Sequence, residues 1–177
     1  MVLMPTPISV AMQYKISVLV FLKNVSGEFL MLQRKKAPNN GLWSPIGGKL
    51  EMASGESPHQ CAVRETLEET GLLVDVSDLH LFCVAAEKAY EGKNHWLMFL
   101  FDCKKTIQTL PENINEGVFG FFSRSQIDTL PIPATDQEGL WDIYDKYHKD
   151  FVALRVDCSP SEALNWTIEQ SISDVRN

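Results

Sequence analysis

Three features common in membrane, nucleic-acid-binding and disulfide-rich proteins are absent from this 177-residue chain. No hydrophobic run approaches the roughly 20 residues of a membrane-spanning helix, and no basic residue precedes the mildly apolar start MVLMPTPISVAMQ, as one would in a secretory signal peptide. Sixteen Lys and Arg stand against 23 Asp and Glu, and the net charge of −7 disfavours a broad surface for nucleic acid or anionic lipid. We therefore expect a cytoplasmic protein with no membrane partner, for which nucleic acid is a disfavoured partner.

The four cysteines do not suggest a metal site or a disulfide framework. They are widely spaced without a CxxC pair, and a chain of this length can build a core without disulfides. We expect them to be reduced and mostly packing residues: Cys61, Cys83, Cys103 and Cys158. Other common motifs are missing as well, since GLWSPIGGK lacks the glycine spacing of a P-loop and neither GxGxxG nor GxSxG occurs.

The length suits one domain, and a hydrophobic content of 45% with 22% charged residues is typical of a globular protein. Runs rich in β-branched and aromatic residues predict strands, and capped segments with helical periodicity predict helices. We expect strands at 14–22, 29–35, 42–46, 74–87, 95–103, 117–123 and 152–157, and helices at 58–70, 125–130 and 137–151. Strands on both sides of a central helix favour an α/β fold around a mixed sheet.

The helix at 58–70 has the clearest boundaries. Ser57 suits the N-cap, Pro58 the first helical position, and Gln60 completes a capping box. Gly71 is a typical residue just after a helix. At about 100° per residue, one stripe of this helix should pack on the sheet: Ala62, Val63, Thr66, Leu67 and Thr70.

The opposite face of this helix should carry a carboxylate cluster of Glu65, Glu68 and Glu69. A solvated acidic face, with Arg64 paired to Glu68, is the ordinary explanation. However, the like charges of Glu65 and Glu69 cost a few tenths of a kcal/mol, and glutamates near a helix C-terminus oppose its dipole. A sequence that accepts both costs suggests that the carboxylates hold hard divalent cations.

The segments GGKLE, GES and RETLEETGL together resemble the signature of the Nudix (MutT-type) hydrolases, which is Gly, five residues, Glu, seven residues and REUxEExGU, with U aliphatic. The matching positions are Glu56, Arg64, Glu65, Glu68, Glu69, Gly71 and Leu72. Seven residues instead of five separate Gly48 from Glu56, which indicates a two-residue insertion at MASG, and Thr66 stands at an aliphatic position. A looser resemblance extends from Tyr14 to about Tyr147.

This resemblance implies a Nudix-type α/β/α sandwich with a central mixed β-sheet. It places a hydrolase domain at 14–150, after an N-terminal extension at 1–13. The extension at 151–177 would pack on the domain or at a dimer interface. The implied partner is a small-molecule nucleotide substrate, bound by a monomer or a homodimer.

The resemblance also implies Mg²⁺-dependent cleavage of a diphosphate by water, with Mn²⁺ as a substitute cation. The metal ligands would be the main-chain carbonyl of Gly48 and the carboxylates of Glu65, Glu68 and Glu69. Glu68 would alternatively activate the water. Arg64 would orient Glu65 or Glu56 by a charge-assisted hydrogen bond, and Glu56 would be either a ligand or only the structural partner of Arg64.

Residues outside the signature would complete the site. Glu116, in EGVFGFF, resembles an additional glutamate that acts as a ligand or base in relatives, although it also fits an ordinary charged loop residue. Arg34 and Lys35 follow the second strand, where relatives place basic residues for phosphates. Asp136 or Thr135, in PIPATDQ, would read a nucleobase. Core or strand packing is the better explanation for Phe29, Trp43, His95 and Trp96.

Several substrates remain open. QRKKAP, GLWSPIGGKLE and the glutamate–aromatic pattern favour a nucleoside triphosphate, such as an oxidised purine dNTP. A nucleoside diphosphate sugar or ADP-ribose is the alternative, and the acidic charge disfavours RNA 5′-end pyrophosphate removal. A non-catalytic nucleotide sensor would be expected to have lost a signature carboxylate, and an isoprenoid diphosphate isomerase has no supporting residue pattern.

Overall fold

The fold is given by a computed structural model that describes residues 12–159 and 163–173. The expected N-terminal extension at 1–13 lies outside these residues except for Met12 and Gln13. In the described part of the chain, no helix has the length and apolar character needed to cross a membrane.

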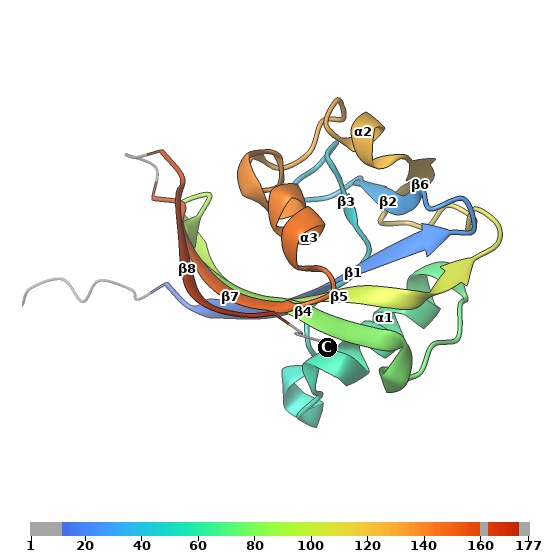
Figure 1. Ribbon diagram of the computed structural model, residues 1–177, viewed down its shortest axis with the longest axis horizontal. Helices are drawn as coiled ribbons and strands as arrows, with labels where there is room; N and C mark the ends of the chain where they lie inside the picture. The colour runs from blue at the N-terminus through green and yellow to red at the C-terminus, as the bar shows by residue number, and fades with distance from the viewer. Residues whose placement is uncertain (1–11, 160–162, 174–177) are drawn as a thin grey trace, which may run out of the picture.

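Within the described residues, eight strands form one mixed sheet (Figure 1). Their order is β3-β2-β1-β5-β4-β7-β8, with β6 also paired to β2. β1 is parallel to β5 and β4 to β7, whereas the other pairs are antiparallel. The strands are β1 (Tyr14–Asn24), β2 (Phe29–Arg34), β3 (Trp43–Pro45), β4 (Leu79–Tyr90), β5 (Asn94–Ile107), β6 (Gly117–Phe122), β7 (Phe151–Asp157) and β8 (Asn165–Ile172).

Helices cover both faces of this sheet. α1 lies on one face, and α2 and α3 lie on the other (Figure 1). The α/β/α arrangement around a mixed sheet, expected from the sequence, is therefore confirmed. The helical elements are η1 (Met52–Ser54), α1 (Pro58–Thr70), η2 (Val76–Asp78), α2 (Arg124–Ile127), η3 (Asp136–Leu140) and α3 (Trp141–Tyr147).

Two hydrophobic cores hold these layers together. Between the sheet and α3, Tyr144 stacks on Phe21 with ring centroids 4.7 Å apart and meets Phe82 edge-on at 5.5 Å. On the α1 side, Cys61 and Ala62 are buried among side chains of β1, β2 and β5. The four cysteines are free, and three of them are fully or nearly fully buried, as expected for packing residues.

The boundaries of α1 are those expected. The N–H of Gln60 donates to Ser57 Oγ at 3.2 Å, and the N–H of Ser57 donates to Gln60 Oε1 at 2.9 Å, which completes the capping box. Gly71 has φ +73°, and its N–H donates to Leu67 O at 2.8 Å. The possible insertion MASG folds outward into η1, where Met52–Ser54 are exposed, so it does not alter the helix.

The prediction of which side chains of α1 are buried was partly wrong. Leu67 is 41% exposed, whereas Glu69 is only 6% exposed and Glu65 is half-buried. The reason is that this side of the helix packs against the glycine turn of Gly47 and Gly48, which leaves space for two carboxylates. Only Glu68 projects into solvent as predicted.

Three other expectations need correction. The strand expected from residue 74 begins at Leu79, because Asp75 and Asp78 close the η2 turn, with Asp75 N–H donating to Asp78 Oδ2 at 2.7 Å. The helix expected at 137–151 is the π-turn η3 followed by α3, which ends at Tyr147, and the helix expected at 125–130 is the shorter α2. β8 was not predicted from the sequence. Together with β7, it makes the segment after residue 150 part of the sheet.

Candidate active site

The glycine turn is fixed against β1 by main-chain hydrogen bonds. Val20 N–H donates to Ile46 O at 2.8 Å, and Val18 N–H donates to Gly48 O at 2.9 Å. Gly47 has φ +149°, and a Cβ there would overlap the carbonyl oxygen of Val18. A Cβ on Gly48 would overlap the carboxylate of Glu65. Gly47 therefore lets the turn lie directly against β1, and Gly48 lets α1 approach the turn with its acidic side.

Glu69 is the most buried acid of this cluster. Gly47 N–H donates to Glu69 Oε2 at 3.1 Å, but Glu69 Oε1 is buried and has no hydrogen-bond partner among the described residues. Burial raises the pKa of Glu69 to about 8, and the negative charge of Glu65 adds to this effect. Burial also raises the pKa of Glu65. An unpaired buried carboxylate oxygen is costly unless a cation or donor occupies the adjacent space.

Arg64 fixes the acids at the edge of the cluster. Its Nε donates to Glu56 Oε1 at 2.8 Å and its Nη2 to Glu56 Oε2 at 2.9 Å, a two-point contact. Its Nη1 donates to Glu65 Oε1 at 2.8 Å and to Glu68 Oε2 at 3.2 Å. The contact with Arg64 lowers the pKa of Glu56 to about 2. Glu56 is thus fully committed to Arg64 and to the N–H of Glu51, which donates to its Oε2.

The donor set suits a hard divalent cation. Glu65 and Glu69 contribute carboxylate oxygens, and the carbonyl of Gly48 lies on the same turn; these are ligand types that Mg²⁺ and Mn²⁺ prefer. Across residues 12–159 and 163–173, no three or more His, Cys, Asp or Glu side chains already form a preassembled metal site. The unpaired Glu69 Oε1 nevertheless fits a cation at this turn.

Two exposed glutamates flank the cluster. The side chain of Glu68 is 59% exposed and held only by Arg64 among the contacts described. Glu116 precedes β6, and its carbonyl accepts from Lys35 N–H at 2.8 Å. The negative charge of Glu116 adds to the raised pKa of both Glu65 and Glu69, so Glu116 lies within electrostatic range of the cluster. Both glutamates can reorient in solvent.

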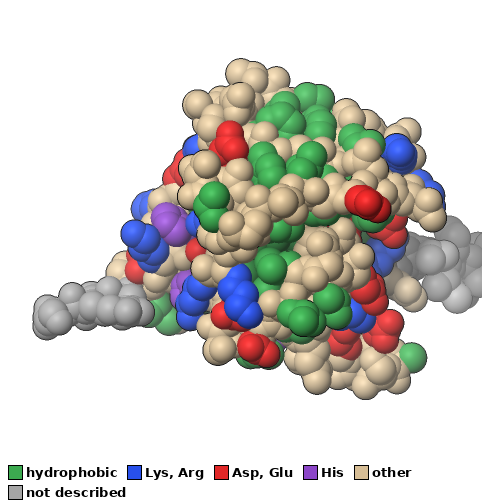
Figure 2. Space-filling model, turned by 90° about the vertical axis from the view of Figure 1, so that its right-hand side faces the viewer, with side chains coloured by type: hydrophobic (Ala, Val, Ile, Leu, Met, Phe, Trp, Pro, Cys, Tyr) green, Lys and Arg blue, Asp and Glu red, His purple; other side chains and the backbone are tan. Residues whose placement is uncertain are grey.

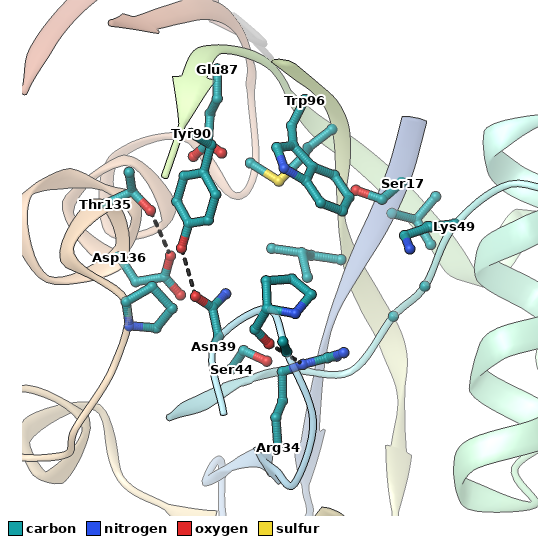
Figure 3. A pocket seen from close by; sticks show the side chains of 18 residues that line it. Ser17, Arg34, Asn39, Ser44, Lys49, Glu87, Tyr90, Trp96, Thr135 and Asp136 are labelled. Carbon is teal, nitrogen blue, oxygen red and sulfur yellow. Dashed lines mark hydrogen bonds between the residues drawn. The ribbon is translucent and has the colours of Figure 1, made fainter. Parts of the chain in front are cut away.

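A cavity of about 160 Å³ extends from the glycine turn across the concave face of the sheet (Figure 3). Gly47, Gly48 and Lys49 border one end, and Arg34 lies nearby with its Nε donating to Pro38 O at 3.0 Å. The labelled side chains line this cavity from β1 to β5, from the loop after β2, from the glycine turn and from the start of η3 (Figure 3). The glycine turn therefore borders the cavity on one side and packs against the acidic side of α1 on the other.

The far end of the cavity holds two buried carboxyl groups, Glu87 of β4 and Asp136 of η3, which are 5% and 8% exposed. Burial raises the pKa of Glu87 to about 7 and that of Asp136 to about 8, and the charge of Glu87 adds to the shift of Asp136. Thr135 Oγ1 donates to Asp136 Oδ1 at 3.3 Å, and Tyr90 OH donates to Asn39 Oδ1 at 2.7 Å (Figure 3). Near neutral pH these acids can therefore donate as well as accept hydrogen bonds.

The structure places the other predicted residues as follows. Arg34, Thr135 and Asp136 line the cavity, but Lys35 is exposed and does not. Trp96 also lines the cavity, contrary to the preference for an ordinary strand residue. Trp43 packs edge-on against Phe122, Phe29 is in the core, and His95 accepts from Ala89 N–H, so these three are packing or strand residues as expected.

Sequence reasoning missed Asn39, Lys49, Glu87 and Tyr90. Glu87 carries a signal that could have found it, because it is the one acid in the otherwise apolar strand segment LFCVAAE. Its alternation with Ala85 and Cys83, both buried, places it on the inward face. Nothing local marks Asn39 or Tyr90, which meet only through the tertiary fold.

Charges of both signs are dispersed over the face shown in Figure 2, and Lys and Arg do not form a broad basic patch on it. This distribution agrees with the net charge of −7. It does not resemble the continuous basic surface that binding along a nucleic-acid backbone needs.

Comparisons with known proteins agree with this geometry. The family model described as the NUDIX domain matches residues 13–147, which confirms the resemblance found in the sequence. An uncharacterised Nudix hydrolase, YvcI of Bacillus subtilis, is 32% identical over 109 residues, or 60% of this chain. The chain spans 65% of the length of that curated relative and 13% of the length of another.

Solved structures share the fold. The MutT protein of Bacillus halodurans superposes with a TM-score of 0.68 at 22% identity, covering 88% of this chain and 97% of that one. The NUDIX domain of Shewanella oneidensis NrtR, crystallised with ADP ribose, gives 0.61 at 17% identity, covering 77% and 88%. At such identities the similarity establishes the fold and leaves the substrate open.

Proposed function

Because the chain belongs to the Nudix hydrolase family, we propose that it is a pyrophosphohydrolase that cleaves a nucleoside triphosphate, with an oxidised purine deoxynucleotide as the first candidate. The observation that carries this proposal is the unpaired, buried Glu69 Oε1 of α1, held against a glycine turn that borders a cavity ending at Glu87 and Asp136. A site with a cation position at one end and hydrogen-bonding groups at the other fits a molecule with a polyphosphate and a base.

Nudix hydrolases generally use divalent metal ions, and here Mg²⁺, or Mn²⁺ in its place, would be held by the Gly48 carbonyl, Glu65, Glu69 and, after reorientation, Glu68. When bound, such a cation offsets the phosphate charge and makes a water more acidic. The protein supplies the oxygen ligands from a helix and a rigid turn, so little rearrangement is needed.

Arg64 acts as the positioning residue of this cluster. Its guanidinium fixes Glu65 Oε1 while its other edge is held by Glu56, so Glu65 can direct its second oxygen to the cation. Glu56 has no free oxygen in this arrangement. We therefore assign Glu56 a structural role and leave the ligand role to Glu65 and Glu69.

Proton removal from the attacking water falls to Glu68 or Glu116. Both are exposed, so either could take up the proton of the water and pass it to solvent. Both border the position of the cation: Glu68 through Arg64, and Glu116 through its charge on Glu65 and Glu69. Their roles differ in what each loss would change, as argued below.

The substrate would lie along the cavity. Arg34 lines it, and its positive charge acts on Glu69, so it is placed to bind a phosphate near the cation. Lys35 lies outside the cavity and could contribute only long-range attraction. Asp136, together with Glu87, would hydrogen-bond a purine edge, because protonated and ionised carboxyls offer both a donor and an acceptor.

ADP-ribose or a nucleoside diphosphate sugar is the competing substrate class, as the NrtR domain named above was crystallised with ADP ribose. The decisive experiment is a screen with Mg²⁺ and with Mn²⁺ across common and oxidised purine nucleoside triphosphates, ADP-ribose, nucleotide sugars and dinucleoside polyphosphates. Phosphate or pyrophosphate release and nucleotide products are measured for each compound.

The screen includes Glu69→Gln, with Glu138→Gln on the exposed surface of η3 as the matched control. We expect hydrolysis of a triphosphate that Glu69→Gln abolishes and Glu138→Gln preserves. Preference for ADP-ribose would replace the substrate assignment, and binding without hydrolysis would identify a sensor instead.

A further inference from the structure

β8, at the edge of the sheet, carries one large side chain that reaches the nucleobase end of the cavity. Register across the strands explains how. Glu87 on β4 pairs with Val156 on β7, and Val156 pairs with Trp166 on β8. Residues in register on adjacent strands project to the same face. Trp166 is therefore in the same cross-strand row as Glu87, two strands away.

The indole of Trp166 packs on η3. The position that a Cβ of Gly139 would occupy lies only 2.6 Å from Cε2 and Cζ2 of this ring, so the ring fills the space left by the glycine. Gly139 lies three residues after Asp136 in the same π-turn. The contact thus determines how closely this turn, and with it Asp136, approaches the sheet.

A second cavity joins the same residues. It measures about 10 Å³, roughly the room of one water, and is bordered by Glu87, Asp136 and Trp166. The indole Nε1 of Trp166 is buried without a hydrogen-bond partner among the described residues. Trp166 thus borders the same small cavity as the two carboxyl residues, and a donor there favours their ionised, accepting forms over their protonated forms.

From these contacts we propose that Trp166 is a positioning residue for nucleobase recognition, and that the β7–β8 hairpin is part of the substrate site. The ring places Asp136 opposite Glu87, and the indole N–H influences how the two carboxyl groups share protons. The inference rests on the proposed function, since it presumes that this end of the cavity receives a base.

The test compares Trp166→Ala, which removes the ring, with Trp166→Phe, which keeps an aromatic ring and removes the N–H. Ile168→Ala is the control on the same strand, because Ile168 is 48% exposed. KM and kcat are measured for the preferred nucleoside triphosphate, and inhibition by inorganic tripolyphosphate reports on the base-free part of the site. Circular dichroism verifies that each variant is folded.

We expect Trp166→Ala to raise KM for the nucleotide at least about tenfold, with little change in kcat or in inhibition by tripolyphosphate. Trp166→Phe should retain most affinity but shift the pH dependence of KM, whereas Ile168→Ala should resemble the wild type. Equal losses for the nucleotide and tripolyphosphate, or an unchanged KM, would overturn the proposal.

A second pair of variants tests the same contact if Trp166→Ala does not fold. Gly139→Ala forces its methyl group into the indole and should raise KM in the same way. In the Trp166→Ala background, Gly139→Ala should have no further effect, because the ring is gone. Additive effects would contradict the assigned contact.

Failure of the proposed function gives a different result. If the wild type hydrolyses no nucleotide, calorimetric titration with a nucleoside monophosphate tests the hairpin without catalysis. Weaker binding by Trp166→Ala would support the role of Trp166, and equal binding would refute it. If the wild type neither hydrolyses nor binds nucleotides, both proposals fail together.

Discussion

The carboxylate of Glu65 occupies the space that a side chain at Gly48 would need. This contact joins two different elements, the glycine turn that is hydrogen-bonded to β1 and the helix α1 that packs on one face of the sheet. Because Gly48 has no Cβ, the Glu65 carboxylate can pack directly against the turn that carries the Gly48 carbonyl. The close approach makes a compact set of oxygen ligands possible.

We predict that Gly48→Ala displaces Glu65 and weakens cation dependence. The concentration of Mg²⁺ at half-maximal activity should rise, and kcat should fall by about tenfold or more. Gly27→Ala is the matched control: Gly27 has φ +81° in a distant turn and open space around it. It should cost about 1 kcal/mol of stability from backbone strain and leave cation dependence unchanged. Equal cation dependence in both variants would contradict this account.

Glu69→Gln should make folding stability less dependent on pH and on the divalent cation. The folded pKa of Glu69, about 8, is raised above that of an unfolded glutamate, so the native state binds more protons between these values. Stability in EDTA should therefore fall as pH rises from about 4.5 to 8 in the wild type. The variant lacks the contribution of Glu69 to that slope.

Thermal unfolding at pH 6 and pH 8.5, with EDTA and with Mg²⁺, measures this difference. Without cation, Glu69→Gln should be at least as stable as the wild type at the higher pH. With Mg²⁺ the order should reverse, because only the wild type gains stability by binding. The prediction fails if Mg²⁺ stabilises both proteins equally.

Glu56→Gln should reduce the loss of folding stability that accompanies acidification. Arg64 lowers the pKa of Glu56 to about 2, so this pair stabilises the fold above the ordinary glutamate pKa and is lost as pH falls from about 4.5 to 2. Urea unfolding at pH 3 and pH 6 should show less pH dependence for the variant. The expected loss at pH 6 is about 1–3 kcal/mol, the usual effect of breaking a charged hydrogen bond. Retention of the wild-type pH dependence would show that Glu56 is not the group responsible.

Asp136→Asn should make nucleotide KM less dependent on pH. Asp136 and Glu87 have pKa values raised to about 8 and about 7 by burial, so both lose their proton donors as pH rises through this range. In the wild type, KM for a base that needs a donor should increase between pH 6 and 9. An asparagine keeps a donor at every pH, so the increase should be smaller.

The measurement is KM across that range for the two proteins, with Gln137→Ala, exposed on the same turn, as control. A wild-type KM that does not change with pH would exclude carboxyl donation as the basis of recognition.

Much of the acidic cluster on α1 could be predicted from local sequence. Ser57, Gln60 and Gly71 define α1 through short-range hydrogen bonds, and the spacing of Glu65 and Glu69 follows from helix geometry. The burial of Glu69 could not be predicted from helix periodicity alone. It depends on what packs against α1, and periodicity does not reveal that the neighbour is a glycine turn rather than apolar sheet residues.

The end of the cavity at Glu87 and Asp136 was less accessible to such reasoning. Asp136 was identified by its turn, but Glu87 joins it only because β4 and η3 meet across the concave face of the sheet. Trp166 reaches them through the β4–β7–β8 register, which involves a parallel pair and therefore a long crossover. Long-range pairing of this kind leaves no mark in the sequence near Trp166.

Glu68→Gln and Glu116→Gln should separate the water-activating group from an auxiliary ligand. Loss of a general base lowers kcat by about 10²–10⁴-fold, while cation binding persists. Loss of a ligand instead raises the Mg²⁺ requirement and is partly restored by excess cation. We expect Glu68→Gln to show the first behaviour, because Arg64 keeps its carboxylate beside Glu65 without burying it.

We expect Glu116→Gln to show the second behaviour, since the charge of Glu116 acts on both Glu65 and Glu69. Glu112→Gln, exposed in the same loop, serves as the control. Measurements of kcat over a range of Mg²⁺ concentrations distinguish the two outcomes. If Glu116→Gln lowers kcat and Glu68→Gln raises the Mg²⁺ requirement, Glu116 becomes the base and Glu68 the ligand. If neither variant lowers kcat or raises the cation requirement, water activation must come from another group.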